Sequence, residues 1–480
     1  MAVSVKGDVE LKDIPTIKKK ALRINLNRNI YGTFAEIGAG QETVRNFFRS
    51  GGASGTIAKA MSAYDKDFSD AIYGVESDNR YVTEPRLKKM LSHEIGLMED
   101  RLSREKHPDK LFFTYANTVA TIDFAKKFKG HGWVGIKFQL DPLEQYNEII
   151  LHVRFKENDA RLQQETLGKL GVNLIYGAFY QHDAPKNLLS SLYDNIDLDQ
   201  IEVDMINFSG PRFTYVDNRI MSLHLVSNGF TNAVMFGKDG FNVLPAQQLY
   251  KANIFTLRGS FRPVTLVNMD MYEKSIEVFL KDKKVNPDKT KVIFELTLPN
   301  LLSDGKLNER DFLDRAELLC SLGHNVLIST FVEYYKLVEY FSEFTKKRMG
   351  MAMGVNNLVQ IFDEKYYRDL SGGILEAFGK IFYRDIKVYL YPIKDKNGVI
   401  VNSETLKVHP RMKELYKFFK YNGKIVDIDN YNPNILDIFS RAVLKMIANG
   451  EEGWEKMLPK GIADQIKEKR LFSYSKTKFK

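Results

Sequence analysis

Over residues 111–360 the chain alternates between short apolar runs and longer amphipathic runs. The apolar runs are rich in β-branched and aromatic residues, as strands are. The longer runs carry apolar residues at spacings of three and four, which is the helical period. This alternation predicts βαβ units and a mainly parallel sheet. The expected strands are 132–139 or 148–155, followed by 172–179, 201–206, 233–236, 253–257, 291–298, 325–330 and 349–354.

Eight such strands are enough to close a (β/α)8-like barrel, which is the α/β fold we expect, with an open doubly wound sheet as the alternative. Residues 1–110 read as a mainly helical region that contains a Gly-Ala-Gly turn and, over 53–63, a helix of small residues. Residues 361–480 read as a mainly helical region with a basic tail. We therefore predict three regions: 1–110, an α/β core over 111–360, and 361–480.

Composition places the protein in the globular class. Of its 480 residues, 44% are hydrophobic and 12% are aromatic, which is enough to fill large cores. The single cysteine, Cys320, lies in an apolar helical run, as a buried thiol in a reducing compartment does. The chain shows no secretory signal, and no apolar run reaches the length of a membrane helix. These features predict a cytoplasmic protein with no membrane partner.

The net charge of +9 is concentrated near the two ends of the chain. Residues 1–30 contain seven basic and three acidic side chains, and residues 460–480 contain seven and two. The remainder is balanced, which argues against a basic groove, and no nucleic-acid-binding motif is present. We predict no specific nucleic-acid partner.

The strongest chemical signal is the segment 257–265, between an expected strand and an expected helix. It contains Arg258, Gly259, Ser260 and Arg262. A glycine and a hydroxyl between two arginines, at a helix start, offer backbone N–H groups and two guanidinium forks to one anion. We predict that these four residues bind an anionic substrate.

A second turn contains Glu36, Gly38 and Gly40, again between an expected strand and an expected helix. This order is typical of turns that bind nucleotides and methyl donors. A full dinucleotide fingerprint needs a third glycine at the position of Thr43. Two interpretations stay open: a cofactor-binding turn made by Glu36, Gly38 and Gly40, for an unknown cofactor, or a tight structural connection.

Two carboxylates are candidate catalysts. Asp204 and Glu295 stand inside apolar runs near the carboxyl ends of expected strands, where ligands collect in α/β sheets. A buried carboxylate is costly unless it is paired, and Arg258 or Arg262 is the expected partner. We predict Asp204 or Glu295 as the acid–base group, with a structural ion pair as the other interpretation.

On the strand expected over 148–155, His152 and Arg154 are two positions apart and share one face. They form a basic pair for a substrate anion if that face lines a cleft, and a solvated surface if it does not. His131 and His182 stand beside flexible neighbours and are further acid–base candidates. No metal-ligand spacing is present, so no metal site is predicted.

Five segments carry a family resemblance: AEIGAGQE at 35–42, AYD at 63–65, LGVNLIYGA at 170–178, RGSFRPVT at 258–265 and GGILE at 372–376. They resemble motifs of an uncharacterised bacterial family found in cyanobacteria and Bacteroidota, over nearly the whole chain. Names given to family members include nicotinate-nucleotide adenylyltransferase and TonB-dependent receptor. The sequence supports neither name, because none of its eight histidines forms an H-x-G-H phosphate turn and it shows no alternating membrane strands. The resemblance implies no activity.

Together these features predict an enzyme that acts on a phosphorylated or otherwise anionic small metabolite. The alternative is a non-catalytic assembly or scaffold protein that forms homo-oligomers. Its 32 Phe and 24 Tyr suit large subunit contacts as well as large cores.

Overall fold

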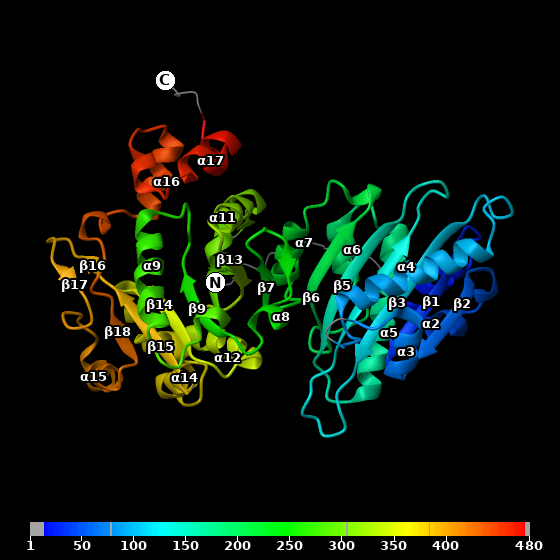
Figure 1. The fold of residues 1–480 in the computed structure, drawn as a ribbon, viewed down its shortest axis with the longest axis horizontal. Coiled ribbons are helices and arrows are strands. Elements are labelled where there is room, and N and C mark those ends of the chain that lie inside the picture. The colour runs from blue at the N-terminus through cyan, green and yellow to red at the C-terminus, as the bar shows by residue number, and fades with distance from the viewer. Residues whose placement is uncertain (1–13, 77–78, 304–305, 384, 476–480) are drawn as a thin grey trace, which may run out of the picture. The chain divides into compact units, whose positions relative to one another are not determined.

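The computed structural model describes residues 14–76, 79–303, 306–383 and 385–475. The chain divides into two compact units, Met1–Thr231 and Asn232–Lys480, called here the N-terminal and C-terminal units. Each unit has its own open sheet with helices packed against it (Figure 1). The α/β class is confirmed, and the sheets are open, as in the alternative fold, rather than closed into a barrel. Residues 1–13 and 476–480, which include part of the predicted basic tail, lie outside the described residues.

The N-terminal unit contains a six-stranded sheet in the order β2-β1-β3-β4-β5-β6. Its strands are β1 (Ile30–Gly38), β2 (Ile57–Ala63), β3 (Leu111–Ala120), β4 (His131–Phe138), β5 (Asn147–Phe155) and β6 (Ile201–Ser209). Strands β2, β1 and β3 pair in parallel, and β3 to β6 pair antiparallel. Its helices are α1 (Ile17–Asn25), α2 (Glu42–Ser50), α3 (Lys66–Tyr73), α4 (Glu84–Arg101), α5 (Ala160–Tyr180), α6 (Pro185–Ser191) and α7 (Asn218–Ser227).

Helices α4 and α5 cover opposite faces of this sheet. On β4, Gly135 lies against Leu87 and Leu91 of α4, whereas Phe138 packs against Phe179 of α5. Successive side chains of a strand point to opposite faces, so the odd-numbered residues of β4 lie on the α4 face. This alternation decides which polar side chains of β4, β5 and β6 meet.

Two local predictions in this unit were wrong. The expected strand over 172–179 is the second half of α5, which is buried on almost every side. Full burial removes the amphipathic period, so periodicity cannot distinguish such a helix from a strand. The expected helix over 53–63 contains strand β2, whose residues alternate between exposed and half-buried. Its small residues follow the period of two because β2 is an edge strand.

The C-terminal unit contains an eight-stranded sheet in the order β18-β15-β14-β9-β10-β13-β7-β8. Its strands are β7 (Ala233–Phe236), β8 (Asn242–Val243), β9 (Asn253–Arg258), β10 (Thr290–Thr297), β13 (Asn325–Ser329), β14 (Met349–Gly354), β15 (Ile386–Tyr391) and β18 (Ile425–Asp427). Two short hairpins are β11 (Leu302–Ser303) with β12 (Lys306–Leu307), and β16 (Ile393–Lys394) with β17 (Ile400–Val401).

Its helices are α8 (Pro245–Leu249), α9 (Leu266–Leu280), α10 (Leu298–Leu301), α11 (Glu309–Ser321), α12 (Tyr334–Phe344), α13 (Val355–Ile361), α14 (Gly373–Phe382), α15 (Lys413–Tyr421), α16 (Ser440–Asn449) and α17 (Ile462–Lys469). Helix α9 covers one face, where Phe279 packs on Phe255 and Tyr389. Helices α12 to α15 cover the other face and share one hydrophobic core with the strands. The sheet is therefore doubly wound.

The six parallel strands of this sheet have the order of a Rossmann-type fold. Taken in chain order as one to six, β9, β10, β13, β14, β15 and β18 lie in the spatial order 3-2-1-4-5-6. The strand order reverses between β9 and β14. In open α/β sheets, ligands bind at the carboxyl ends of the strands beside such a reversal. The turn that follows β9 is the predicted anion-binding segment, and it stands at this position.

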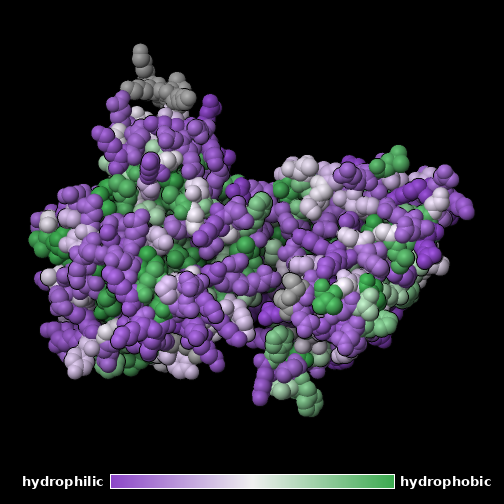
Figure 2. Space-filling view, in the orientation of Figure 1, coloured by the Kyte–Doolittle hydropathy of each residue, from purple (hydrophilic) through white to green (hydrophobic). Residues whose placement is uncertain are grey.

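The predicted core region over 111–360 is divided between the two units, because β3 to β6 belong to the first sheet, whereas β7 to β10, β13 and β14 belong to the second. The alternation of strands and helices along the sequence continues across position 231. The strands before and after this position nevertheless belong to different sheets. No helix in the described part of the chain is long and apolar enough to cross a membrane. On the surface that Figure 2 shows, apolar groups form scattered patches among hydrophilic ones.

Candidate functional site

Two histidines and an aspartate form a hydrogen-bonded chain in the N-terminal unit. His152 Nδ1 lies 2.6 Å from Asp204 Oδ1, and His152 Nε2 lies 3.2 Å from His131 Nδ1. The three residues come from adjacent antiparallel strands, β5, β6 and β4. His152 and Asp204 are 2% and 7% exposed, whereas His131 is half-buried. We call this group the relay.

One proton arrangement satisfies both contacts of the relay. In it, His152 Nδ1–H donates to the Asp204 carboxylate, because an ionised carboxylate only accepts hydrogen bonds. His152 Nε2 accepts from His131 Nδ1–H, and Nε2 of His131 is the unprotonated outer end. Burial, together with the neighbouring His152, lowers the pKa of His131 to about 4. His131 is therefore neutral at pH 7 and able to accept a proton.

Aromatic rings and a second carboxylate enclose the relay. The ring of Trp133 lies 4.9 Å from that of His152, and the ring of Phe128 lies 5.9 Å from that of His131. Burial raises the pKa of Glu202, and Asp204 raises it further. Glu202 accepts a hydrogen bond from Thr231 at 2.6 Å. The inner part of the relay, His152 and Asp204, is thus buried and held by packing.

Basic side chains gather near the outer end of the relay. Arg154 lies 3.6 Å from Glu202, and the charges of Arg154 and Arg80 both lower the pKa of His131. The connection between β3 and β4 carries exposed Lys126, Lys127 and Lys129 next to His131 in the chain. An anion near His131 would meet a positive field.

The structure brings most of the predicted acid–base and basic residues of this unit together and leaves one apart. Asp204 and His152 contact each other directly, and Arg154 lies on the same face of β5, two residues from His152. His131 completes the relay, while His182 does not take part. Sequence reasoning missed Glu202 and Trp133. Residues 131, 133, 152 and 154 do alternate on two expected strands, and the missing information was the pairing of β4 with β5.

Glu36 lies at the carboxyl end of β1 and fills the N-terminus of α2. Its carboxylate accepts the backbone N–H groups of Thr43 and Val44, and the side-chain amide of Asn117. It occupies the position at which a helix N-terminus would hold a phosphate. Burial raises the pKa of Glu36 to about 7. The hydrogen bonds act in the opposite direction, but their effect is smaller than that of burial.

Gly38 and Gly40 allow the chain to turn close to β3. Gly38 has φ of +80°, and a Cβ there would lie 2.2 Å from the carbonyl oxygen of Val119. A Cβ on Gly40 would lie 2.0 Å from Asn117 Oδ1. Both glycines have a structural reason to be present. The role of Glu36, Gly38 and Gly40 in cofactor binding stays a prediction.

In the C-terminal unit, Arg258 and Glu295 form a buried ion pair. Arg258 Nε and Nη2 donate to the two carboxylate oxygens of Glu295 at 2.8 and 3.0 Å. Ser329 donates to Glu295 at 2.6 Å, and the guanidinium stacks 4.3 Å from the ring centre of Tyr334. The expected pairing of Glu295 with an arginine is confirmed. Asp204 lies in the other unit and pairs with His152 instead.

Gly259, Ser260 and Arg262 lie further along the same turn. Ser260 is exposed, and the Arg262 side chain is 34% exposed with its Nε 2.5 Å from Asp311. Arg315 is buried, pairs with Asp311, and donates to the carbonyl oxygen of Ser260 at 3.2 Å. Two guanidinium groups share one carboxylate here, so the turn retains an excess positive charge. Its anion-binding role stays a prediction.

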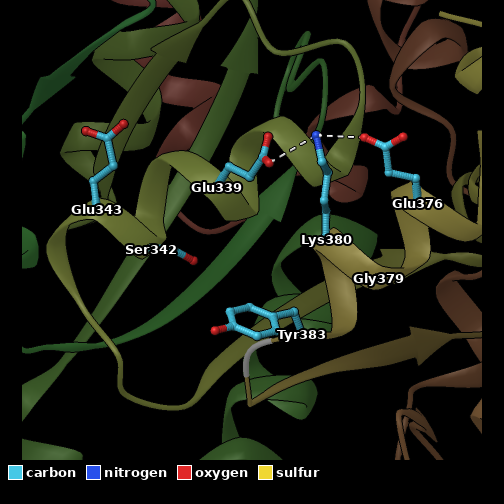
Figure 3. A pocket seen from close by; sticks show the side chains of 7 residues that line it. All are labelled: Glu339, Ser342, Glu343, Glu376, Gly379, Lys380 and Tyr383. Carbon is cyan, nitrogen blue, oxygen red and sulfur yellow. Dashed lines mark ion pairs between the residues drawn. The ribbon is translucent and has the colours of Figure 1, made fainter. Parts of the chain in front are cut away.

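A cavity of about 730 Å³ lies between α12 and α14 of the C-terminal unit. Lys380 extends between Glu339 and Glu376, 3.4 and 3.3 Å away (Figure 3). Glu343 and Tyr383 also line the cavity. None of the predicted site residues is on its wall, and its carboxylates outnumber its cations, so it does not suit the predicted anionic substrate. Among the described residues, no group of three histidine, cysteine or acidic side chains is placed to hold a metal ion.

No protein-family model matches the chain, and no curated protein matches it in sequence. Solved structures of several bacterial proteins are similar to part of it. The competence/damage-inducible protein CihA from Agrobacterium tumefaciens is 14% identical, with a TM-score of 0.24, over 34% of this chain and 95% of its own. A competence-damaged (CinA) superfamily protein from Enterobacter cloacae is 11% identical, with a TM-score of 0.26, over 37% and 98%. Similarities at this level carry no conclusion about function.

Proposed function

We propose that the N-terminal unit catalyses a proton-transfer reaction on a phosphorylated or otherwise anionic small metabolite, with His131 as the acid–base group. The relay carries this proposal. An aspartate that orients one histidine, which in turn orients a second histidine at the outer end, resembles the way an aspartate orients a catalytic base in general acid–base catalysis.

The relay accounts for each proton. His131 Nε2 takes a proton from the substrate, and the Nδ1 proton of His131 passes to His152 Nε2. His152 becomes an imidazolium whose Nδ1–H remains hydrogen-bonded to Asp204, and the carboxylate stabilises the new charge. Reversal of the two transfers returns the proton to the product. Arg154 and Arg80 supply the positive field for a substrate anion.

The decisive experiment is a turnover screen with a single-residue control. Purified full-length protein is incubated with pooled phosphorylated and carboxylated metabolites, and substrate loss is followed by mass spectrometry. We expect His131→Asn to lower the rate by about 100-fold or more, the usual contribution of a general base. His93→Asn, at an exposed position on α4, is the matched control and should keep the wild-type rate.

The pH profile provides an independent readout. A base acts in its neutral form, and His131 becomes neutral above a pKa of about 4. The rate should therefore rise as the pH increases through about 4 and then stay level to neutral pH. A His131→Asn protein as active as wild type would reject the proposal. If wild type changes no compound but forms a defined homo-oligomer, the assembly alternative replaces it.

A second candidate function concerns the C-terminal unit, and the strand order favours it. The turn after β9 stands beside the reversal of strand order, where ligands bind in doubly wound sheets. Because Glu295 already engages Arg258, we propose that Gly259, Ser260 and Arg262 bind the anion and that Arg258 orders the turn. Phosphorylated metabolites should raise the melting temperature of wild type but not of Arg262→Ala. Lys281→Ala, an exposed cation in the same unit, is the control. Equal shifts for all three proteins would contradict the assignment.

A further inference from the structure

The C-terminal unit contains a second cavity, of about 470 Å³, which we call the α13–η5 cavity. It lies where the end of α13 meets two short 3-10 helices, η4 (Glu364–Tyr367) and η5 (Pro410–Met412). It is separate from the turn after β9 and from the cavity of Figure 3, since none of their residues lines it. Its chemistry differs from both.

Apolar side chains form one part of the cavity wall. Phe362 and Met412 are buried, and the ring of Phe362 packs on Phe378 and Tyr416 of the hydrophobic core. Val359 is 40% exposed and also lines the cavity. An apolar group that entered would therefore extend the core of this unit and leave water.

Charged side chains form the rest. Asp363 and Lys365 pair with each other at 2.6 Å, so their charges cancel. Arg368 and Arg411 are exposed, and neither forms an ion pair within the described residues. With Glu364 counted, the acidic, lysine and arginine side chains of the lining sum to one excess positive charge. The two arginines come from segments far apart in sequence, and both line this cavity.

We propose that the α13–η5 cavity binds a small amphiphilic monoanion, a carboxylate joined to an alkyl or aromatic body. Arg368 and Arg411 bind the carboxylate, because guanidinium groups match its two oxygens. Val359, Phe362 and Met412 contact the apolar body. A monoanion balances the single excess charge, whereas a phosphate dianion would exceed it.

Three probes separate the two parts of the proposal. Octanoate, acetate and octylammonium are titrated into the full-length protein by calorimetry. Octanoate should bind. Acetate has the charge without the tail and should bind at least about tenfold more weakly, since each buried methylene contributes. Octylammonium has the tail with the opposite charge and should not bind. Equal binding of octanoate and octylammonium, or of octanoate and acetate, would overturn the proposal, as would no binding of octanoate.

Variants test the residues. Arg368→Gln and Arg411→Gln should each weaken octanoate binding about tenfold, the usual effect of losing one charged hydrogen bond. Val359→Trp fills the cavity from a partly exposed position and should abolish binding without removing a charge. Lys396→Gln makes the same charge change in the turn of the β16–β17 hairpin and should leave the affinity unchanged. Circular dichroism confirms that each variant is folded. If both arginine variants bind octanoate like Lys396→Gln, the assignment is wrong.

Discussion

Replacing Arg258 with alanine is expected to lower the free energy of unfolding of the C-terminal unit by about 3–5 kcal/mol. Glu295 is 0% exposed, and after the substitution Ser329 would be the one described residue whose hydrogen bond to its carboxylate remains. A buried carboxylate that loses its cation keeps the full cost of desolvation. The loss should be far larger than that of an exposed pair, which contributes about 1 kcal/mol at most.

The two tryptophans allow each unit to be followed separately. Trp133 lies in the N-terminal unit and Trp454 in the C-terminal unit, both buried, and the chain has only these two. In a Trp133→Phe background, urea unfolding followed by fluorescence reports the C-terminal unit. Lys281→Ala breaks the exposed pair with Glu277 and is the control.

A double variant tests the physical reason for the Arg258 effect. Arg258→Met with Glu295→Gln removes both charges, so it should recover a large part of the stability that Arg258→Ala loses. If Arg258→Ala costs no more than Lys281→Ala, the pair does not hold the turn in place. In that case Arg258 would be free to act on a ligand, as the sequence alone suggested.

Gly38→Ala is expected to destabilise the N-terminal unit by about 3 kcal/mol or more, from two separable causes. A φ of +80° costs an alanine about 1–2 kcal/mol. The new Cβ would also lie 2.2 Å from the carbonyl oxygen of Val119, which forces β1 and β3 apart. The measurement is urea unfolding of a Trp454→Phe protein, in which Trp133 reports this unit.

Gly74 provides a matched control for the first cause. It has φ of +83° and ψ of 160° in the same unit, and no atom of the described residues lies within 4 Å of the position of its Cβ. Gly74→Ala should therefore lose only the conformational part, about 1–3 kcal/mol. The difference between the two variants measures the contact with β3. Equal losses would show that β1 and β3 tolerate a side chain at Gly38, and a ligand would then be the better reason for a glycine there.

The two predictions address one question, whether a residue with a chemical signature is kept for stability or for binding. Arg258 and Gly38 both belong to motifs that suggest an anion or a cofactor. Both also have a complete structural role, Arg258 through Glu295 and Gly38 through Val119. His131 is different, because no hydrogen bond from another described residue reaches its outer nitrogen. That contrast is why the proposed catalysis rests on the relay.

The sequence by itself determined the features that depend on near neighbours. The strand, glycine turn and helix around Gly38, most of the parallel strands of the C-terminal unit and the turn after β9 all follow from local period and turn residues. The cost of a lone buried carboxylate was enough to predict an arginine partner for Glu295. These arguments need no knowledge of distant contacts.

Only the tertiary structure decided which strands share a sheet. Pairing depends on residues far apart in the chain, so the split between β6 and β7 and the strand order of the second sheet leave no local trace. The relay has the same origin, because β4, β5 and β6 bring His131, His152 and Asp204 together through their register. The segment 172–179 was misread for a related reason: burial on all sides removed the period that would have identified a helix.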